Sequence, residues 1–359
     1  MTMAITLSHG GPTTYSSPTP SQQVLVGTIQ GVVCMERDGD GPGWHIAHRA
    51  LTDKHVHALL IEPESGTLFA GLNYGSIFAS VDAGHTWEQR DLGLTEHDVY
   101  SLACVQVDGG TRLYAGTEPA HLFYSDDLGQ HWAELPALRA GDTSHWSFPA
   151  PPHIAHTKHI TFHPQDPHTL FVGIEQGGLL KSTDDGHTFQ VIPGMDDDIH
   201  RTVINPLNPE QMYITTGIGM YVSADGGATW EQWTDLQHDI GGYPDLLVLH
   251  PRQPHRLFVA SARKGPGSWF QDHFAGSRIS KSTDGGRTWE PVPLGGPERL
   301  RTAFEAMCLE DWGESFSLFG ATATGEVWCS DDGGEQWTEV LSGLAPISKG
   351  RHYAAFVTA

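Results

Sequence analysis

Short apolar runs, separated by turn-forming residues, recur along most of the chain. Residues 57–61, 67–71 and 76–79 form one set of three runs, and residues 159–162, 169–173 and 179–181 form another. Runs of this length, bounded by Gly, Pro, Asn and Asp, are typical of β-strands joined by tight turns. Each set therefore predicts three consecutive strands of an antiparallel meander.

A turn of the form S-x-D-x-G-x-[THQ]-[WF] follows the third run of each set. It occurs six times, starting at Ser80, Ser125, Ser182, Ser223, Ser282 and Ser330. Asp in a tight turn accepts hydrogen bonds from nearby backbone N–H groups, and Gly supplies the positive φ that the turn needs. The aromatic residue then opens a fourth strand and is suited to burial between sheets. Each unit is thus predicted to be a four-stranded antiparallel sheet.

This motif resembles the Asp-box, or bacterial neuraminidase repeat, of sialidases, sortilin-type receptors, xyloglucanases and a photosystem II assembly factor. The resemblance extends from about Gln23 to the end of the chain. In its size the chain is similar to single-domain, glycosyl-hydrolase-like proteins built from this repeat. The resemblance implies a β-propeller, whereas function has to be argued from the site, because one fold carries many functions.

A further unit precedes the first Asp-box. Residues 24–27 and 31–34 are apolar runs, and Trp44 lies 43 residues before Trp87, which matches the spacing of the other units. This unit lacks an upstream strand, while residues 351–357 resemble the run at 57–61. We therefore predict an all-β, seven-bladed propeller of four-stranded antiparallel blades, whose ring is closed by the C-terminal strand. The predicted domains are a flexible N-terminal arm over residues 1–22 and a single propeller over residues 23–359.

The net charge limits the classes of binding partner, and the cysteines indicate the cellular compartment. The chain has 43 Asp and Glu residues against 20 Lys and Arg residues, a formal net charge of −23. Such an excess argues against nucleic acid or an anionic membrane as partner. The four cysteines lack metal-binding spacing and are predicted to be free thiols in a reducing compartment. Because residues 1–20 have neither the basic nor the apolar region of a secretion signal, we expect a cytoplasmic protein.

One face of the ring is the candidate functional face. In a four-stranded meander the Asp-boxes share one end of each blade, and the two long insertions, residues 136–156 and 263–278, fall at the other end, the top face. Insertions in repeat proteins gather on the binding face. Inner strands also begin there with polar residues. The residues predicted to bind a ligand are His57, Tyr74, Tyr100, Trp146, His159, His200, Arg201, Trp269, Arg301 and Arg351.

Two kinds of chemistry fit these residues. In a glycosidase, two carboxyl groups flank the scissile bond, and Glu175 and Asp245 are the candidates. The resemblance to sialidases implies a catalytic tyrosine, for which Tyr243 and Tyr353 are the candidates, although the Arg-Ile-Pro signature of sialidases is absent. In a metal site, His57, His159 and His200 would bind a divalent transition metal, because neutral imidazole suits such ions.

Binding without catalysis is the third function that fits. The chain would then be a scaffold similar to the photosystem II assembly propeller, and basic residues at the channel mouth would hold an acidic protein partner. The expectation carried forward is a small polar ligand, carbohydrate-like or acidic, at the top of the central channel. The associated activity would be of the glycosidase, hydrolase or lyase type.

Overall fold

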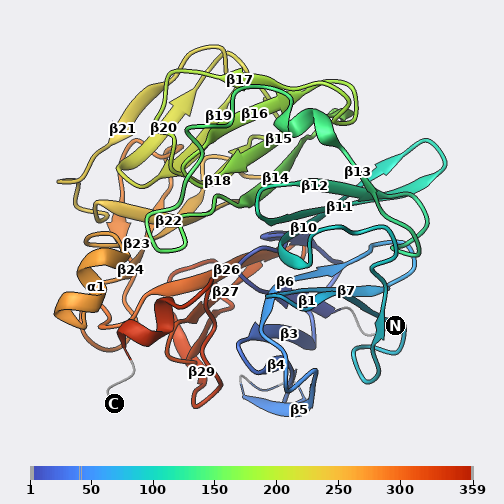
Figure 1. Ribbon diagram of the computed structural model, residues 1–359. Coiled ribbons are helices and arrows are strands. Elements are labelled where there is room, and N and C mark those ends of the chain that lie inside the picture. The colour runs from blue at the N-terminus through green and yellow to red at the C-terminus, as the bar shows by residue number, and fades with distance from the viewer. Residues whose placement is uncertain (1–3, 40, 42, 357–359) are drawn as a thin grey trace.

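Seven β-sheets form the blades of a ring around a central channel (Figure 1). The computed structural model describes residues 4–39, 41 and 43–356. Within each blade, neighbouring strands are antiparallel except where the N-terminal residues add a parallel strand. The predicted all-β, seven-bladed propeller is confirmed.

Blades two to six each contain four strands in sequence order, from the channel to the rim. Blade two contains β6 (Val56–Ile61), β7 (Leu68–Leu72), β8 (Ser76–Ser80) and β9 (Glu88–Gln89), and blade three contains β10 (Asp98–Val107), β11 (Gly110–Glu118), β12 (Leu122–Ser125) and β13 (Ala133–Glu134). Blade four contains β14 (Thr157–His163), β15 (Asp166–Ile174), β16 (Gly178–Ser182) and β17 (Gln190–Ile192). Blade five contains β18 (Ile199–Ile204), β19 (Met212–Thr216), β20 (Gly219–Ser223) and β21 (Glu231–Thr234), and blade six contains β22 (Tyr243–Leu249), β23 (Leu257–Ala262), β24 (Arg278–Ser282) and β25 (Glu290–Pro291).

The N-terminal residues close the ring, so the predicted closure by a C-terminal strand is wrong. In blade one, β1 (Ala4–Leu7) pairs in parallel with β3 (Gln23–Thr28), which continues into β4 (Gly31–Arg37) and β5 (Trp44–Ala50). In blade seven, β2 (Thr14–Ser16) pairs in parallel with β26 (Phe304–Asp311), which continues into β27 (Phe316–Thr322), β28 (Val327–Ser330) and β29 (Thr338–Leu341). The C-terminal residues instead form a 3₁₀ helix, η2 (His352–Ala355), and Val357 lies outside the described residues.

Residues 4–16, here called the N-terminal latch, are therefore part of the ring and not the free arm that was predicted. Ile5 and Leu7 of the latch are buried in one core cluster with Val26 of blade one and Phe319 of blade seven. Between its two strands the latch crosses the channel, where the Gly10 N–H donates to the His57 carbonyl oxygen at 2.9 Å. The latch thus joins the first and last blades, a junction that would otherwise expose two sheet edges.

Each Asp-box joins the third and fourth strands of its blade, as predicted. In the box of blade two, the Ser80 hydroxyl donates to Asp82 Oδ1 at 2.8 Å, and the Gly84 N–H donates to Ser80 Oγ at 3.0 Å. Asp82 also accepts from the Thr86 N–H at 2.9 Å, and the Trp87 indole donates to the Gly84 carbonyl at 2.9 Å. The polar groups of the box therefore form hydrogen bonds with one another, which makes it a structural turn.

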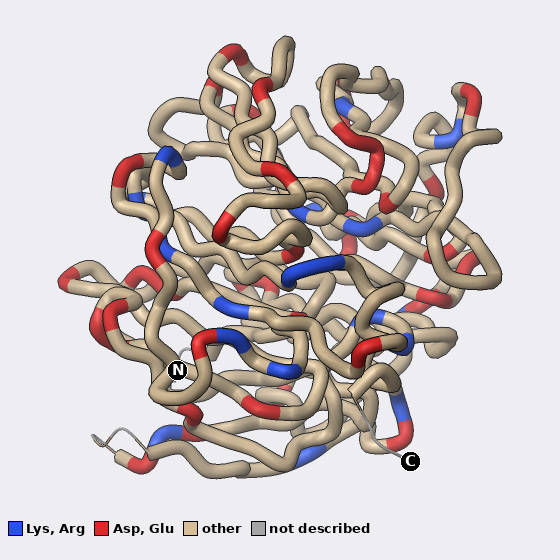
Figure 2. Tube along the Cα trace, turned by 90° about the vertical axis from the view of Figure 1, so that its left-hand side faces the viewer, with Lys and Arg blue, Asp and Glu red and all other residues tan. Residues whose placement is uncertain are grey.

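Among the residues that the structure describes, helical structure is confined to short segments near the top face. These are η1 (Pro136–Arg139), α1 (Pro266–Asp272) and η2, and α1 and η2 lie side by side (Figure 1). Among the described residues, no helix is long and apolar enough to span a membrane. Acidic residues lie on loops throughout the side view of the molecule (Figure 2), and all four cysteines are free.

Candidate functional site

A β-bulge near the start of the inner strand recurs in six blades and places one side chain per blade at the channel. In β6, Val56 pairs with Leu72 and Ala58 pairs with Gly71, so His57 has no partner in the ladder. In the other five inner strands, the corresponding register shifts leave one residue each without a partner in the ladder: Tyr100, Lys158, His200, Asp245 and Glu305. Because a bulge re-aims the side chain of its extra residue, the six bulges account for the polar residues at the channel mouth.

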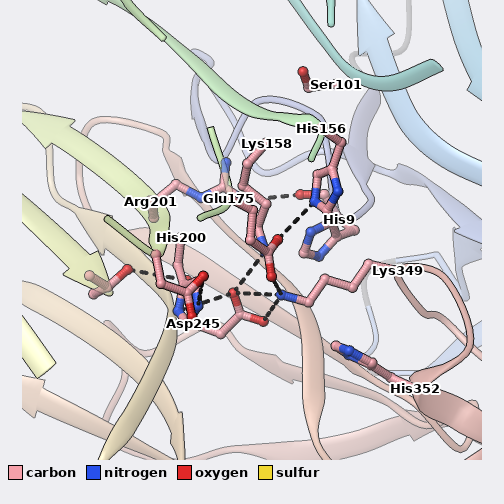
Figure 3. Close-up of polar contacts among 12 residues, drawn as sticks. His9, Ser101, His156, Lys158, Glu175, His200, Arg201, Asp245, Lys349 and His352 are labelled. Atoms are coloured by element: carbon pink, nitrogen blue, oxygen red, sulfur yellow. Dashed lines mark hydrogen bonds and ion pairs between the residues drawn. The ribbon is translucent and has the colours of Figure 1, made fainter. Parts of the chain in front are cut away.

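Two of these residues, Lys158 and Asp245, form a buried charge cluster with Glu175 and Lys349 (Figure 3). Lys158 Nζ lies 2.6 Å from Glu175 Oε2 and 3.6 Å from Asp245 Oδ1. Lys349 Nζ, which enters from the segment before η2, lies 3.4 Å from Glu175 Oε1 and 3.2 Å from Asp245 Oδ2. Buried charges persist only when they are paired, and here each cation contacts both anions.

The lysines set the ionisation of the carboxylates. Burial alone would raise the pKa of Glu175 and Asp245, but Lys158 and Lys349 hold the pKa of both carboxyls well below the usual range. Burial lowers the pKa of Lys158, whereas Asp245 and Glu175 outweigh burial at Lys349 and hold the pKa of that ammonium well above its usual value. Neither carboxyl can therefore act as a general acid near neutral pH.

Two neighbouring cavities open above the cluster on the top face. Chamber A, about 510 Å³, is lined by Phe148, Pro149, Ala150, Glu175, Asp198, Gly217, Tyr243, residues 264–268, Phe270 and His352. Chamber B, about 720 Å³, is lined by His55, His57, Asn73, Tyr74, Asp98, Tyr100, Glu118, Phe148, residues 150–152, Phe270 and residues 349–354. Phe148 and Phe270, one from each insertion, line both chambers. Both long insertions thus lie on the top face, as predicted.

The floor of chamber B holds a carboxyl with unusual acidity. Asp98 accepts two hydrogen bonds from Asn73 Nδ2, at 3.1 and 2.9 Å, and its Oδ1 lies 3.6 Å from His57 Nδ1. Burial raises the pKa of Asp98 to about 7, although the Asn73 amide opposes that change. Burial also lowers the pKa of His57 well below its usual value, so this imidazole stays neutral. Asp98 is therefore a group in this chamber that can hold or release a proton near neutrality.

Several predicted residues do meet at the two chambers. Glu175 lines chamber A, and His57, Tyr74, Tyr100, Arg351 and Tyr353 line chamber B. Asp245 and His200 are buried just beneath, where His200 Nδ1 lies 3.8 Å from Asp245 Oδ1. The ring of Tyr100 is stacked on the imidazole of His156 with centroids 3.7 Å apart, whereas Tyr74 is 73% exposed.

The predicted aromatic ligand contacts, Trp269 and Trp146, are corrected. Trp269 is only 1% exposed, packs against Tyr243 and Phe356, and donates from its indole to the Lys264 carbonyl at 2.7 Å. Trp146 packs against a core cluster of blades three and four and lines neither chamber. An insertion needs its own hydrophobic anchor, and these indoles serve that purpose.

Three predicted polar residues have their hydrogen bonds inside the protein. Arg201 Nη1 donates to His159 Nδ1 at 2.8 Å, and His159 Nε2 donates to the Thr202 carbonyl at 3.2 Å. Arg301 donates to the backbone carbonyls of His273 and Phe356 and lies outside both chambers. These residues hold segments together and line neither chamber A nor chamber B.

The predicted metal triad His57, His159 and His200 is also corrected. Both ring nitrogens of His159 are occupied by Arg201 and Thr202, so this side chain has no free lone pair for a metal. Among the described residues, the one group of potential ligand atoms that converges contains only His200 of the three, together with Glu175 and Asp198.

Sequence reasoning missed Asp98, Glu305, Lys349 and His9 as parts of the site. Asp98 precedes its bulged residue by two positions, as Asp198 precedes His200, a spacing that the sequence does contain. Lys349 and His9 carry no such signal, because they lie in non-repeated segments at the two ends of the chain. His9 Nδ1 donates to the Glu305 carbonyl at 3.0 Å within the channel.

Comparisons with known proteins agree with this architecture. The family described as Sortilin, neurotensin receptor 3, matches residues 177–298. The xyloglucanase Xgh74A of Acetivibrio thermocellus is 25% identical over 313 residues, which cover 72% of this chain and 35% of that protein. The chain thus spans about a third of the length of this relative.

Solved structures show the same fold. The GH74 xyloglucanase from Xanthomonas campestris superposes with a TM-score of 0.69 at 17% identity, over 94% of this chain and 55% of that one. YCF48 bound to D1 peptide superposes with a TM-score of 0.52 at 17% identity, over 77% of this chain and 79% of that one. Together with its six Asp-boxes and seven blades, these similarities support a sialidase-, sortilin- and xyloglucanase-like propeller.

Proposed function

We propose that the protein binds a small, hydroxyl-rich ligand of carbohydrate type in chamber B, with one end of the ligand reaching chamber A beneath Phe148 and Phe270. A concave site with an apolar wall and a few convergent polar groups is the usual form of a small-molecule site. Here Phe148, Phe270 and Pro152 supply the apolar wall of chamber B, and His57 and Asp98 supply polar groups.

This proposal rests mainly on the burial of His57 and on its lack of hydrogen-bond partners. Its ring is 1% exposed, lines chamber B, and makes no well-formed hydrogen bond through either nitrogen to any described residue. A buried polar group without a partner costs about 1–3 kcal/mol, and native proteins retain few of them. Sugar hydroxyls both donate and accept, so they match a neutral imidazole that presents one donor and one acceptor.

Any hydrolytic chemistry belongs to Asp98 and not to the predicted pair Glu175 and Asp245. Those two carboxylates are ionised and held by lysines, whereas Asp98 has a pKa of about 7. Glu118 lines the same chamber as Asp98 and raises the pKa of its carboxyl further. Two carboxyl groups that face one site are what acid–base cleavage of a glycosidic bond requires.

An acidic peptide is the second candidate ligand. Lys264 lines chamber A and Arg351 lines chamber B, so each chamber has a basic residue despite the acidic surface. The YCF48 propeller in the comparison is bound to a peptide. The cytoplasmic location stays a prediction and enters neither proposal.

Calorimetric titration with a panel of neutral oligosaccharides, uronates and acidic peptides tests the proposal. We expect a saccharide to bind the wild-type protein and the His57→Ala variant to weaken that binding at least about tenfold, which corresponds to about 1.4 kcal/mol. His163→Ala is the matched control, because His163 lies at the opposite end of its blade and outside both chambers. Binding of peptides alone would favour the second candidate, and saccharide binding unchanged in His57→Ala would overturn the assignment of chamber B.

A further inference from the structure

Three potential metal ligands converge where blades four and five meet. Ligand atoms of Glu175, Asp198 and His200 all lie within 4.8 Å of one another. An isolated β-bridge joins the backbones of Glu175 and Asp198, and His200 is the bulged residue of β18. Gly217 packs against Asp198 so closely that a Cβ there would lie 2.3 Å from Asp198 Oδ2. The backbone therefore fixes all three residues on ordered elements.

The hydrogen bond of His200 determines which nitrogen faces the two carboxylates. His200 Nδ1 lies 2.8 Å from the Pro244 carbonyl oxygen, which can only accept, so Nδ1 carries the proton. In the neutral ring, Nε2 then presents a lone pair. This fully buried atom makes no hydrogen bond to any described residue and lies 3.6 Å from Asp198 Oδ1. Imidazoles that bind metals usually donate their other N–H to a backbone carbonyl or a carboxylate in this way.

The separation of these two atoms matches a shared metal ion better than a direct contact. A hydrogen bond would place nitrogen and oxygen at about 2.7–3.2 Å, and the observed 3.6 Å is too long. Two ligand atoms bound to one tetrahedral ion at about 2.1 Å lie about 3.4 Å apart. Three groups that present lone pairs to one point require a donor or a cation between them.

We infer that Glu175, Asp198 and His200 form a binding site for a divalent transition-metal ion of the zinc type. One imidazole and two carboxylates are a ligand set that such ions accept, and three protein ligands leave a further coordination position open. Glu175 and Asp198 both line chamber A, so the open position faces that cavity. This site differs from the ligand site centred on His57, and each can exist without the other.

The neighbouring lysines set the strength of the site. Glu175 Oε2 accepts from Lys158 Nζ at 2.6 Å and from His156 Nε2 at 2.9 Å, so both lone pairs of this oxygen are used. Glu175 Oε1 has one longer contact, with Lys349 Nζ at 3.4 Å, so a lone pair of this oxygen is left to bind an ion. The two lysines repel a dication. We therefore expect this site to bind its metal ion more weakly than a closed structural zinc site does, and to exchange it.

Metal titration of the untagged, chelator-treated protein tests this inference without any sugar present. Zn²⁺ and Co²⁺ are added to the wild-type protein and to Asp198→Asn, which keeps the shape of the side chain but weakens its ligand oxygen. We expect about one ion per chain with a Kd in the micromolar range for wild type, and at least about a tenfold loss of affinity in the variant. Asp197→Asn is the matched control, because Asp197 is exposed, adjacent in sequence and outside the triad.

A spectroscopic measurement on the wild-type protein keeps the test independent of variant folding. Co²⁺ in a four-coordinate site gives intense visible absorption, which we expect at one equivalent and which Zn²⁺ should displace. Circular dichroism confirms that both variants are folded. Absence of stoichiometric binding, or equal affinity in Asp198→Asn and Asp197→Asn, would overturn the site. Saccharide titrations are read separately, so failure there leaves this result unaffected.

Discussion

Arg201 Nη2 donates a hydrogen bond of 2.9 Å to the carbonyl oxygen of His9, although 192 residues separate the two in sequence. His9 belongs to the N-terminal latch and Arg201 to the inner strand of blade five, so this contact holds the latch across the channel. Burial lowers the pKa of Arg201 to about 10, and its guanidinium remains charged at neutral pH. A charged donor makes a strong hydrogen bond to a carbonyl.

Substitution of Gly10 should loosen the latch. A Cβ at Gly10 would lie 1.9 Å from the backbone oxygen of Tyr100, which cannot move aside as a flexible side chain could. We expect Gly10→Ala to reduce the free energy of unfolding by about 1–3 kcal/mol through overpacking. Gly141→Ala is the control, since a Cβ there meets no atom within 4 Å. Equal thermal unfolding midpoints for the two variants would contradict the role of the latch.

Substitutions of Trp269 and Phe270, which are neighbours in α1, should affect different properties: the first should reduce stability and the second should weaken ligand binding. Trp269 is 1% exposed and packs against Phe356, so Trp269→Ala should cost about 3–5 kcal/mol of stability. Phe270 is 48% exposed and lines both chambers, so Phe270→Ala should change stability by less than about 0.5 kcal/mol but weaken ligand binding. Thermal unfolding and calorimetric titration of both variants separate the two roles. A stable Trp269→Ala protein would show that the insertion does not depend on its indole.

Removal of the Lys349 ammonium group should lower the free energy of unfolding, because two buried carboxylates lose one of their cations. In Lys349→Met, Glu175 and Asp245 keep Lys158, and Glu175 also keeps His156, but each carboxylate loses one of its two lysines. Breaking a buried ion pair in this way costs about 3–5 kcal/mol at neutral pH. In the wild-type protein the pKa values of both carboxyls are depressed, so their contribution is present above the unfolded pKa and is lost as pH falls through the folded pKa.

The difference between Lys349→Met and the wild-type protein should therefore shrink as the pH falls below about 5, because protonation relieves the carboxylates of the variant. Urea unfolding of both proteins across this pH range measures this difference in the free energy of unfolding. Lys54→Met is the control, since its partner Asp53 is largely exposed and such pairs contribute little. A pH-independent difference would mean that packing of the lysine side chain, and not its charge, matters.

Asp98 should make the protein less stable as the pH rises. Its pKa is about 7 in the folded protein and near 4 in the unfolded chain, so the folded state binds the extra proton between these values. Stability from this group is complete below about pH 4 and is lost as the pH rises to about 7. Asp98→Asn should remove this dependence, so the variant gains stability relative to wild type by about 1–3 kcal/mol near pH 8.

The control for Asp98→Asn is Asp108→Asn, an exposed position on the following loop. We expect this control to follow the wild-type pH profile in thermal unfolding. Parallel profiles for wild type and Asp98→Asn would show that the Asp98 carboxyl is not held neutral, and the assignment of Asp98 as a proton donor would fail with it.

The repeated parts of this fold were predictable from sequence, whereas its closure was not. Six Asp-boxes with regular spacing determine the blades and the face on which the insertions lie. The latch escaped prediction because Ala4–Leu7 is a single short strand in a segment rich in Ser, Thr and Pro, and only the parallel pairing with Gln23–Thr28 buries it.

The candidate site was predictable where the repeat produces it. His57, Tyr100, His200 and Asp245 occupy equivalent bulge positions, so alignment of the repeats finds them. Arg301, which was also predicted to bind a ligand, does not belong to that series, because the bulged residue of blade seven is Glu305. Partners such as Lys349 come from outside the repeat, and no local pattern indicates which charges a distant segment will neutralise.

The latch also imposes an order on biosynthesis. The residues around His9 leave the ribosome before the seven blades, yet their contacts include Arg201 and Glu305, which are synthesised only after most of the blades. Long-range contacts of this kind delay folding, because much chain must be ordered before they form. The nascent protein must therefore keep the latch undocked until blade seven has been synthesised, and a product truncated before blade seven cannot close the ring.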